Sequence, residues 1–406
     1  MFLLKFLSRN PGDTGPISVE YRLACSGQLC NRRVLTLGDD RKSDASRILL
    51  KGPLELFVVA HPFDAYPQEL CLRLSLDYVT ELHGAFESGT SRITLLPDED
   101  IVEDFCSILT LLSRRLVSPI VKVQERHADH GSHAYDALGS YGLECPTPIL
   151  NPSEAPVWKR RPLTIVTSSE GQKIVNNNPP LVGVDPGALS EFLIQFPNVP
   201  KADQVVYAAR LYRTALETIE VRPDIAYLLL VSAVETLADV AFKDWEPTEF
   251  EKLEAKAPLT SCAQQMRLTA EQTKQLVLAD CKSEKWATKK FKKFLLDFTP
   301  LDQLEVDDRV FIVPSFLCPA KDAIPKTLGL IYKARSDNVH VGSPFPRSIR
   351  IGTTAALGIR DLPPNWPFGG RPDIPPVTWF ERVVWLASSQ FVLQESGIKS
   401  IPCVST

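Results

Sequence analysis

Short runs in which apolar and polar residues alternate occupy residues 1–96, and stretches rich in Gly, Pro, Asp and Ser separate them. Such alternation is typical of strands that bury one face, and Leu70–Tyr78 shows it most regularly. Strands are therefore predicted at Ile17–Leu23, Arg33–Leu37, Leu54–Val59, Leu70–Tyr78 and Ser91–Leu96. The chain is expected to begin with a mainly β module.

The hydrophobic period changes to that of an amphipathic helix after residue 97. Ile101, Ile108 and Leu112 fall on one face, and the acidic residues of the first turn suit the positive end of the helix dipole. From residue 124 to about 200 the chain is rich in Pro and has no clear period. We expect an irregular surface connection there, from which Leu163–Val166 can return one strand to the first module.

From about residue 203, apolar residues recur every three or four positions, which is the pattern of helices that bury one face. Helices are predicted at 203–219, 223–242, 248–255, 269–279, 283–298, 322–340 and 377–396. The helix that begins at Pro223 is apolar nearly all round, apart from a polar stripe that includes Glu235. A helix of this kind belongs at the centre of an antiparallel bundle.

These elements predict an α+β fold. We expect a β-rich module with one helix at 1–123, a Pro-rich connection at 124–202 that can pack on this module, and a helical bundle at 203–406. The length of 406 residues suits two or three domains, and a hydrophobic content of 44% is enough to form a sizeable core.

Charge and cysteine usage narrow the class of protein. A formal net charge of −4 at pH 7 excludes a protein that binds nucleic acid over its whole surface, although a local basic patch is compatible with it. No apolar run reaches the ~18 residues that a membrane span needs. The nine cysteines are scattered and odd in number, which indicates reduced thiols. We therefore expect a cytoplasmic protein without a membrane segment.

The helix predicted at 322–340 carries the most informative residues. Arg335 falls within its apolar stripe, where a guanidinium is costly unless it is paired or opens onto a polar cleft. Glu235 in the polar stripe of the second helix is the natural partner. His340 follows five residues later, roughly 140° around an ideal helix. The two side chains converge only if the helix frays at 338–340, or if two chains pair and each contributes one motif.

An Arg and a His together suit cleavage of RNA without a metal. Histidine can take the proton from a ribose 2′-OH or give one to the leaving 5′-oxygen. Arginine can hold the phosphate and stabilise the negative charge that builds on it. DNA lacks the attacking hydroxyl, so this chemistry is restricted to RNA.

The segment from Tyr332 to Gly342 resembles the Tyr-x-x-Arg-Ser-x-x-x-His-x-Gly signature of the Apea-like branch of HEPN domains. The upstream Val234-Glu235-Thr236-Leu237 resembles the Glu-bearing helix of that branch, and the likeness covers about 203–400. Many HEPN domains are ribonucleases of toxin, antiphage-defence or RNA-processing systems, and they typically dimerise. The resemblance implies that Arg335 and His340 are the catalytic pair, with RNA as the substrate and a homodimer as the active form.

The resemblance also implies supporting roles for neighbours of the pair, namely Glu235, Tyr332, Ser336, Asp337 and Asn338. Many nuclease members carry Asn, Asp or His directly after the arginine, whereas Ser336 stands at this position here. Two alternatives therefore remain open. Arg335 and His340 form an RNA-directed site, or Arg335 is a structural ion pair with Glu235 and His340 stabilises the end of its helix.

Two further groups of residues have chemical potential. His127, His130 and His133 recur at intervals of three and could bind zinc, but the spacing is not that of a standard finger, and a polar surface loop is the simpler interpretation. A lysine-rich helix face offers RNA-binding candidates, which are Lys289, Lys290 and Lys293. A solvated face of an amphipathic helix explains the same pattern.

The sequence contains no P-loop, no dinucleotide fingerprint and no zinc-protease motif, so no cofactor and no resident metal are predicted. The first hypothesis is a metal-independent endoribonuclease in a stress, toxin or antiphage-defence role, whose N-terminal module senses a trigger or binds a partner protein. The alternative is a non-catalytic module for dimerisation or for binding RNA or protein.

Overall fold

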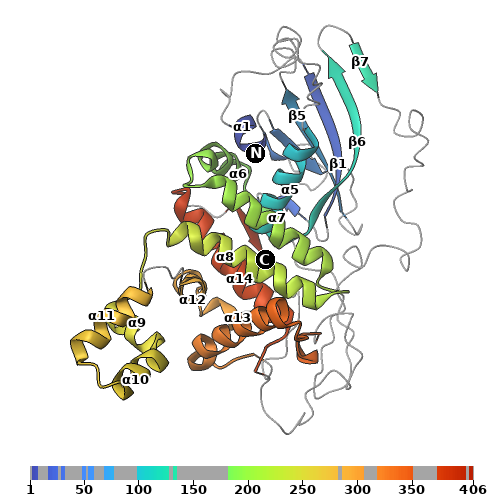
Figure 1. Ribbon diagram of the computed structural model, residues 1–406. Coiled ribbons are helices and arrows are strands. Elements are labelled where there is room, and N and C mark those ends of the chain that lie inside the picture. The colour runs from blue at the N-terminus through green and yellow to red at the C-terminus, as the bar shows by residue number, and fades with distance from the viewer. Residues whose placement is uncertain are drawn as a thin grey trace, which may run out of the picture.

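An antiparallel sheet is followed by a bundle of helices, so the fold class is α+β, as the hydrophobic pattern predicts (Figure 1). The structure, a computed structural model, describes residues 2–7, 17–25, 29–32, 48–51, 54–58, 68–76, 98–127, 131–134, 182–281, 286–305, 318–350, 373–398 and 402–405.

Six antiparallel strands form the larger sheet, in the order β3-β4-β5-β1-β6-β7. Their bounds are Ile17–Cys25 (β1), Ile48–Leu50 (β3), Leu54–Val58 (β4), Gln68–Leu76 (β5), Val117–His127 (β6) and Gly131–Ala134 (β7). The strands predicted near 17–23, 54–59 and 70–78 are confirmed. Those predicted at 33–37, 91–96 and 163–166 lie outside the described residues.

One face of this sheet packs on helix α5 (Asp98–Ser113). Val19 and Leu23 of β1 and Leu72 of β5 are fully buried, at alternate positions along their strands. The short helix α1 (Phe2–Leu7) packs against α5 and buries Leu3. The alternation that predicted the strands is therefore the alternation that builds the core.

A second, three-stranded sheet joins parts of the chain that are far apart in sequence. Strand β8 (Val182–Val184) pairs in parallel with β2 (Leu29–Asn31) and antiparallel with β9 (Cys403–Ser405). The buried Gln68 side chain completes the connection to the larger sheet, because its amide exchanges hydrogen bonds of 2.8 and 2.9 Å with the backbone of Leu29.

The helical region extends from α6 to α14. The principal helices are α6 (Pro186–Gln195), α7 (Ala202–Thr218), α8 (Pro223–Ala241), α12 (Ala287–Phe298), α13 (Ile324–Val341) and α14 (Val377–Glu395). Short 3-10 helices lie at Phe196–Asn198, Gln303–Glu305, Lys321–Ala323 and Arg347–Arg350. Helix α8 contacts α7, α12, α13 and α14, so the prediction that it is central is confirmed.

The prediction of an irregular connection from 124 to about 200 is wrong at both ends of that range, where the structure has strands and a helix. The strand β6 continues to His127 and pairs with β7, while β8 and α6 begin before residue 190. The start of α6 is well specified locally, because Asp185 accepts from the backbone N–H groups of Gly187 and Ala188 and Pro186 occupies the first turn. Prolines on either side of this helix concealed the pattern.

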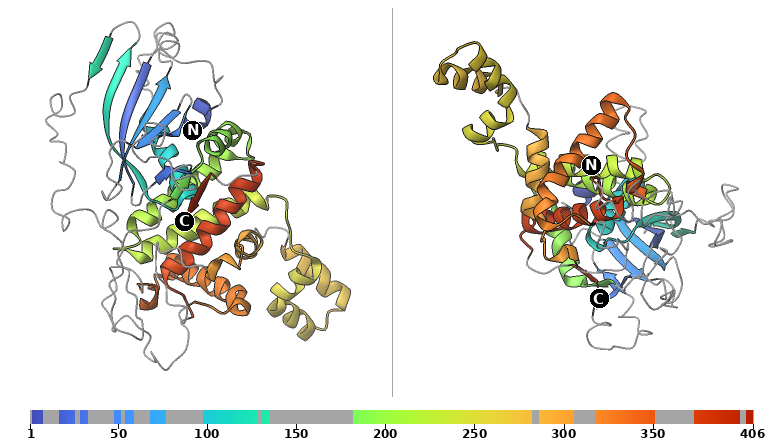
Figure 2. Two further views of the ribbon diagram at one scale, coloured as in Figure 1. Left: turned by 180° about the vertical axis from the view of Figure 1, so that it is seen from behind. Right: turned by 90° about the horizontal axis from the view of Figure 1, so that it is seen from below.

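Three short helices, α9 (Glu249–Ala255), α10 (Ala257–Gln265) and α11 (Ala270–Cys281), stand apart from the bundle (Figures 1 and 2). They share a small core of their own, formed by Val277, Cys281 and Trp286. Helix α10 was not predicted from the sequence, because its apolar residues are few and show no clear period.

A buried ion pair links the first module to the bundle. Arg114, at the end of α5, donates to Glu381 of α14 at 2.5 Å, and Tyr212 of α7 donates to the same carboxylate at 2.6 Å. The Arg114 guanidinium also lies 5.0 Å from the ring centre of Trp385. Both charged side chains are buried, so each depends on the other for its stability.

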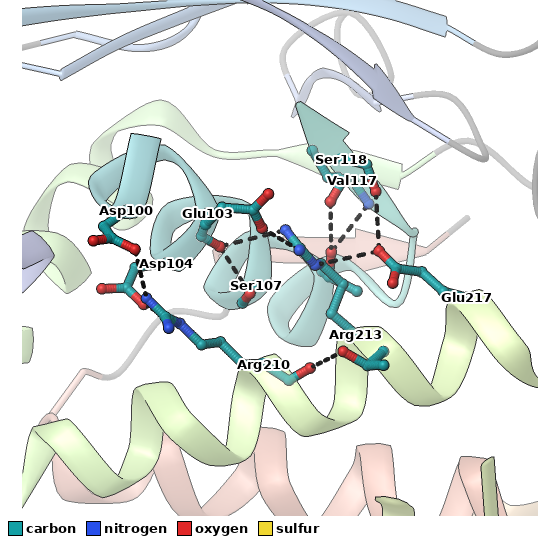
Figure 3. Close-up of polar contacts among 11 residues, drawn as sticks. Asp100, Glu103, Asp104, Ser107, Val117, Ser118, Arg210, Arg213 and Glu217 are labelled. Atoms are coloured by element: carbon teal, nitrogen blue, oxygen red, sulfur yellow. Dashed lines mark hydrogen bonds and ion pairs between the residues drawn. The ribbon is translucent and has the colours of Figure 1, made fainter. Parts of the chain in front are cut away.

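Further charged side chains line the contact between α5 and α7 (Figure 3). Arg210 donates to Asp104 at 2.6 Å, and Arg213 lies between the carboxylates of Glu103 and Glu217. Burial raises the pKa of Asp104 and that of Glu217, although the neighbouring arginines act in the opposite direction. This row of ion pairs fixes the register of the two helices.

Within the described parts of the chain, no helix is both long and apolar enough to cross a membrane.

We expect Arg114→Ala to reduce the free energy of unfolding by about 3–5 kcal/mol, because it leaves a buried carboxylate without its counter-charge. The double variant Arg114→Met with Glu381→Leu should be much closer to the wild type, since it removes both charges. Urea denaturation followed by circular dichroism measures this. Arg222→Ala, which breaks an exposed pair with Asp224, is the control and should leave the midpoint unchanged. Equal losses in the single and double variants would contradict the assignment.

Candidate functional site

Helix α13 continues without interruption through His340. Gly342 ends it with a positive φ of 72°, a conformation that favours glycine. The N–H of Gly342 donates to the Asn338 carbonyl at 3.1 Å, and the N–H of Ser343 donates to that of Asp337 at 3.2 Å. The bond from the left-handed Gly342 to Asn338 is that of the αL type of helix end, and the two bonds together satisfy carbonyls of the last turns. The fraying at 338–340 that would have brought Arg335 and His340 together within one chain does not occur.

Arg335 is paired with Glu235 of α8, as the sequence predicts. Its Nη2 donates to Glu235 Oε2 at 2.8 Å, and the Tyr332 hydroxyl donates to Glu235 Oε1 at 2.8 Å. The side chains of Arg335 and Glu235 are 22% and 23% exposed. One carboxylate therefore orients both side chains of α13, while the guanidinium keeps some access to solvent.

Tyr332 connects this pair to the neighbouring helix α12. Its ring packs against Phe291 at a centroid distance of 5.2 Å, and the Arg335 guanidinium lies 6.0 Å from the ring centre. Burial, followed by the hydrogen bond to Glu235, raises the pKa of Tyr332 to about 12, although a hydrogen bond from Thr288 acts in the opposite direction. Tyr332 is consequently neutral at physiological pH and acts here as a hydrogen-bond donor.

His340 lies apart from Arg335, on an exposed part of the last turn of α13. Val339 and Val341 beside it are 54% and 75% exposed. Because α13 remains helical between positions 335 and 340, the two side chains project roughly 140° apart. A single chain therefore does not bring the two residues of the motif together.

The other residues predicted to support the site act locally on α13. Asp337 accepts from Lys333, one turn earlier, at 2.9 Å, and the side-chain amide of Asn338 donates to the Ser343 carbonyl at 2.9 Å. Ser336 is partly exposed. Of the predicted supporting residues, Glu235 accepts a hydrogen bond from Arg335, and Tyr332 donates to the same carboxylate.

The three lysines predicted to bind RNA are all engaged within the chain. Lys289 donates to the Glu251 carbonyl at 2.9 Å, Lys290 pairs with Asp239 at 3.4 Å, and Lys293 pairs with Asp297 at 2.7 Å. The contacts of Lys289 and Lys290 connect α12 to α9 and α8, whereas Lys293 pairs with a residue one turn later on α12 itself. The pattern of charge on α12 does not reveal the partners of Lys289 and Lys290, because they come from other elements of the fold.

Two residues of α12 lie near the motif, of which Thr288 was not singled out from the sequence and Lys292 belongs to the lysine-rich face of that helix. Thr288 interacts with Tyr332, and Lys292 lies beside Gly329 of α13. A spacing of four residues places both on the same side of α12. Their relation to Arg335 depends on how α12 and α13 pack, and no local signal in the sequence indicates it.

The histidine candidates for a metal site lie around the β6–β7 hairpin. The backbone pairing sets His127 opposite Gly131 and His133 opposite Glu125, while His130 and the side chains of His127 and His133 lie outside the described part. Among the side chains that the structure does describe, no group of three or more His, Cys, Asp or Glu residues is arranged to hold a metal ion.

No family model, curated protein or solved structure matches this chain.

We expect Tyr332→Phe to lower the free energy of unfolding by about 1–2 kcal/mol, because it removes a hydrogen bond to a partly exposed carboxylate. The pKa of Tyr332 is raised, so this stabilisation is complete below the ordinary value of 10 and is lost only as the pH rises through about 12. Urea titrations of the variant and wild type should therefore give the same difference at neutral pH and at about pH 9. A difference that disappears between these two conditions would contradict the assigned bond.

Proposed function

We propose that this protein is a metal-independent endoribonuclease of the HEPN type, in which Arg335 and His340 act on RNA. The observation that supports this proposal best is that the Arg335 side chain is fixed in orientation and still partly exposed. Its guanidinium is held by Glu235 through one nitrogen, is partly exposed, and retains further N–H donors, which can bind a phosphate in a fixed orientation.

His340 would supply the proton transfer. An exposed imidazole can accept the proton of a ribose 2′-OH near neutral pH. The 2′-oxygen then bonds to the adjacent phosphorus, the bond from phosphorus to the 5′-oxygen breaks, and that oxygen takes a proton. The products are a 2′,3′-cyclic phosphate and a 5′-hydroxyl. Arg335 would stabilise the negative charge on the phosphorus oxygens during this step.

The active form proposed is a homodimer, because the geometry of α13 keeps the two residues of one chain apart. In a symmetric pair, Arg335 of one copy can meet His340 of the other, which gives two composite sites. Exposed Val339 and Val341 beside His340 offer apolar surface for such a contact. We place this activity in the cytoplasm, in a stress, toxin or antiphage-defence role, with the N-terminal module as the part that receives a trigger.

A non-catalytic role is the second candidate, and one observation favours it. The ion pair of Arg335 with Glu235, together with the hydrogen bond from Tyr332, is sufficient to explain an arginine in the apolar stripe of α13. The helical region would then serve dimerisation or binding of RNA or protein.

We expect the purified protein to cleave single-stranded RNA in the presence of EDTA and to leave the same sequence in DNA intact. His340→Ala should lower the rate by about a hundredfold or more, in line with the usual contribution of a general acid or base. Gel analysis of a labelled oligoribonucleotide measures the rate and identifies the cyclic phosphate. Lys333→Gln, on the exposed side of the same helix, is the control. Equal rates in the wild type and His340→Ala would rule out the mechanism.

Composite sites predict complementation between two inactive variants. A mixture of Arg335→Ala and His340→Ala, exchanged through mild denaturation and refolding, should recover about a quarter of the wild-type activity, because half of the dimers are mixed and each holds one intact site of two. Each variant treated alone should remain inactive. A mixture as inactive as its components would instead place the two residues in one chain or leave them without a catalytic role.

A further inference from the structure

Lys292 differs from the other lysines of α12. Lys289, Lys290 and Lys293 each have a partner in the chain, whereas the Lys292 ammonium makes no hydrogen bond or ion pair with any residue that the structure describes. Its side chain is only partly exposed. A partly buried cation without a counter-charge is a costly arrangement, and a bound anion would offset that cost.

The position of Lys292 relates it to the Arg335 site. Helices α12 and α13 run antiparallel where they meet, since Thr288 interacts with Tyr332 and Lys292 with Gly329. A Cβ at Gly329 would lie 4.0 Å from the Lys292 Nζ, so the ammonium is close to the bare backbone of α13. Gly329 and Arg335 are six residues apart, which is roughly 9 Å along the helix axis and about 120° around it.

We propose that Lys292 is a phosphate-binding residue that holds an RNA strand one or two nucleotides away from the phosphate at Arg335. This inference rests on the proposed function, because it takes RNA as the substrate. Two cations beside α13, one of them without a partner among the residues that the structure describes, suit a ligand that carries single negative charges at regular intervals. An acidic peptide presents its carboxylates at less regular positions.

Partial burial also favours a defined contact. The aliphatic part of Lys292 packs near Gly329, so the side chain loses less freedom on binding than a fully exposed lysine would. Glycine at position 329 places no side chain between the ammonium and α13. A side chain from position 329 therefore does not cover this side of the ammonium.

The test is the binding of a fluorescein-labelled 2′-O-methyl oligouridylate, which carries the phosphates of RNA but lacks the attacking hydroxyl. Fluorescence anisotropy with the full chain at several NaCl concentrations gives the affinity and its salt dependence. Lys292→Gln should bind about fivefold more weakly near 0.1 M salt, and the slope of log affinity against log salt should fall by about 0.7, the contribution of one phosphate contact on a single strand.

Two variants serve as controls. Lys274→Gln makes the same change of charge on α11, among the helices that stand apart from the bundle, so the affinity should stay at the wild-type value. Lys292→Arg keeps the charge and should keep the salt slope. Circular dichroism establishes that all variants are folded.

The outcomes separate this inference from the proposed activity. Lys292-dependent binding by a protein that does not cleave RNA would support the phosphate site and overturn only the catalytic proposal. Cleavage of RNA with equal affinity and slope in Lys292→Gln and Lys274→Gln would overturn the phosphate site alone. Absence of binding to the oligouridylate, or equally strong Lys292-dependent binding of a poly-glutamate peptide, would overturn the assignment to RNA.

Discussion

The buried pair between Arg114 and Glu381 is the interaction on which the arrangement of the whole chain depends. An arginine does not lose its proton, so its charge persists in the core and requires the Glu381 carboxylate at 2.5 Å. Tyr212 donates to the same carboxylate, and the three residues come from α5, α14 and α7. Displacement of any of these helices would leave a buried charge or hydroxyl unsatisfied. The sheet module and the bundle are therefore held in one relative position.

This constraint extends toward the motif through packing. Phe380 precedes Glu381 on α14, and its ring stacks on Tyr227 of α8 at 4.9 Å. It also contacts Phe291 of α12 at 6.4 Å, and Phe291 in turn packs on Tyr332 at 5.2 Å. The orientation of Tyr332, and through it that of the Glu235 carboxylate, is consequently fixed by the same helix that carries the buried charge. Packing contacts therefore connect the helix of the buried pair to the motif through Phe380, Phe291 and Tyr332.

Several cations near that motif are already paired within the chain. Arg335 and the predicted RNA-binding lysines Lys289, Lys290 and Lys293 all have partners within the chain, and their charges contribute to the packing of α8, α9, α12 and α13. Arg335 alone among them combines a fixed orientation with a position on the motif helix. This is why its pairing with Glu235 is compatible both with a structural role and with a prepared phosphate site, and why activity has to be separated from stability by experiment.

The sequence by itself determined the α+β class, the strands β1, β4 and β5, the long helices, and the pairing of Arg335 with Glu235. Each follows from a local period or from the cost of an unpaired guanidinium in an apolar stripe. Only the tertiary structure decided that α13 stays helical beyond His340, that Lys289 and Lys290 are paired with other helices, and that Lys292 lies beside Gly329. The three-stranded sheet and the pair of Arg114 with Glu381 were likewise not predicted from the sequence. Apart from the end of α13, these features join residues far apart in sequence, and their energies depend on partners that no local pattern identifies.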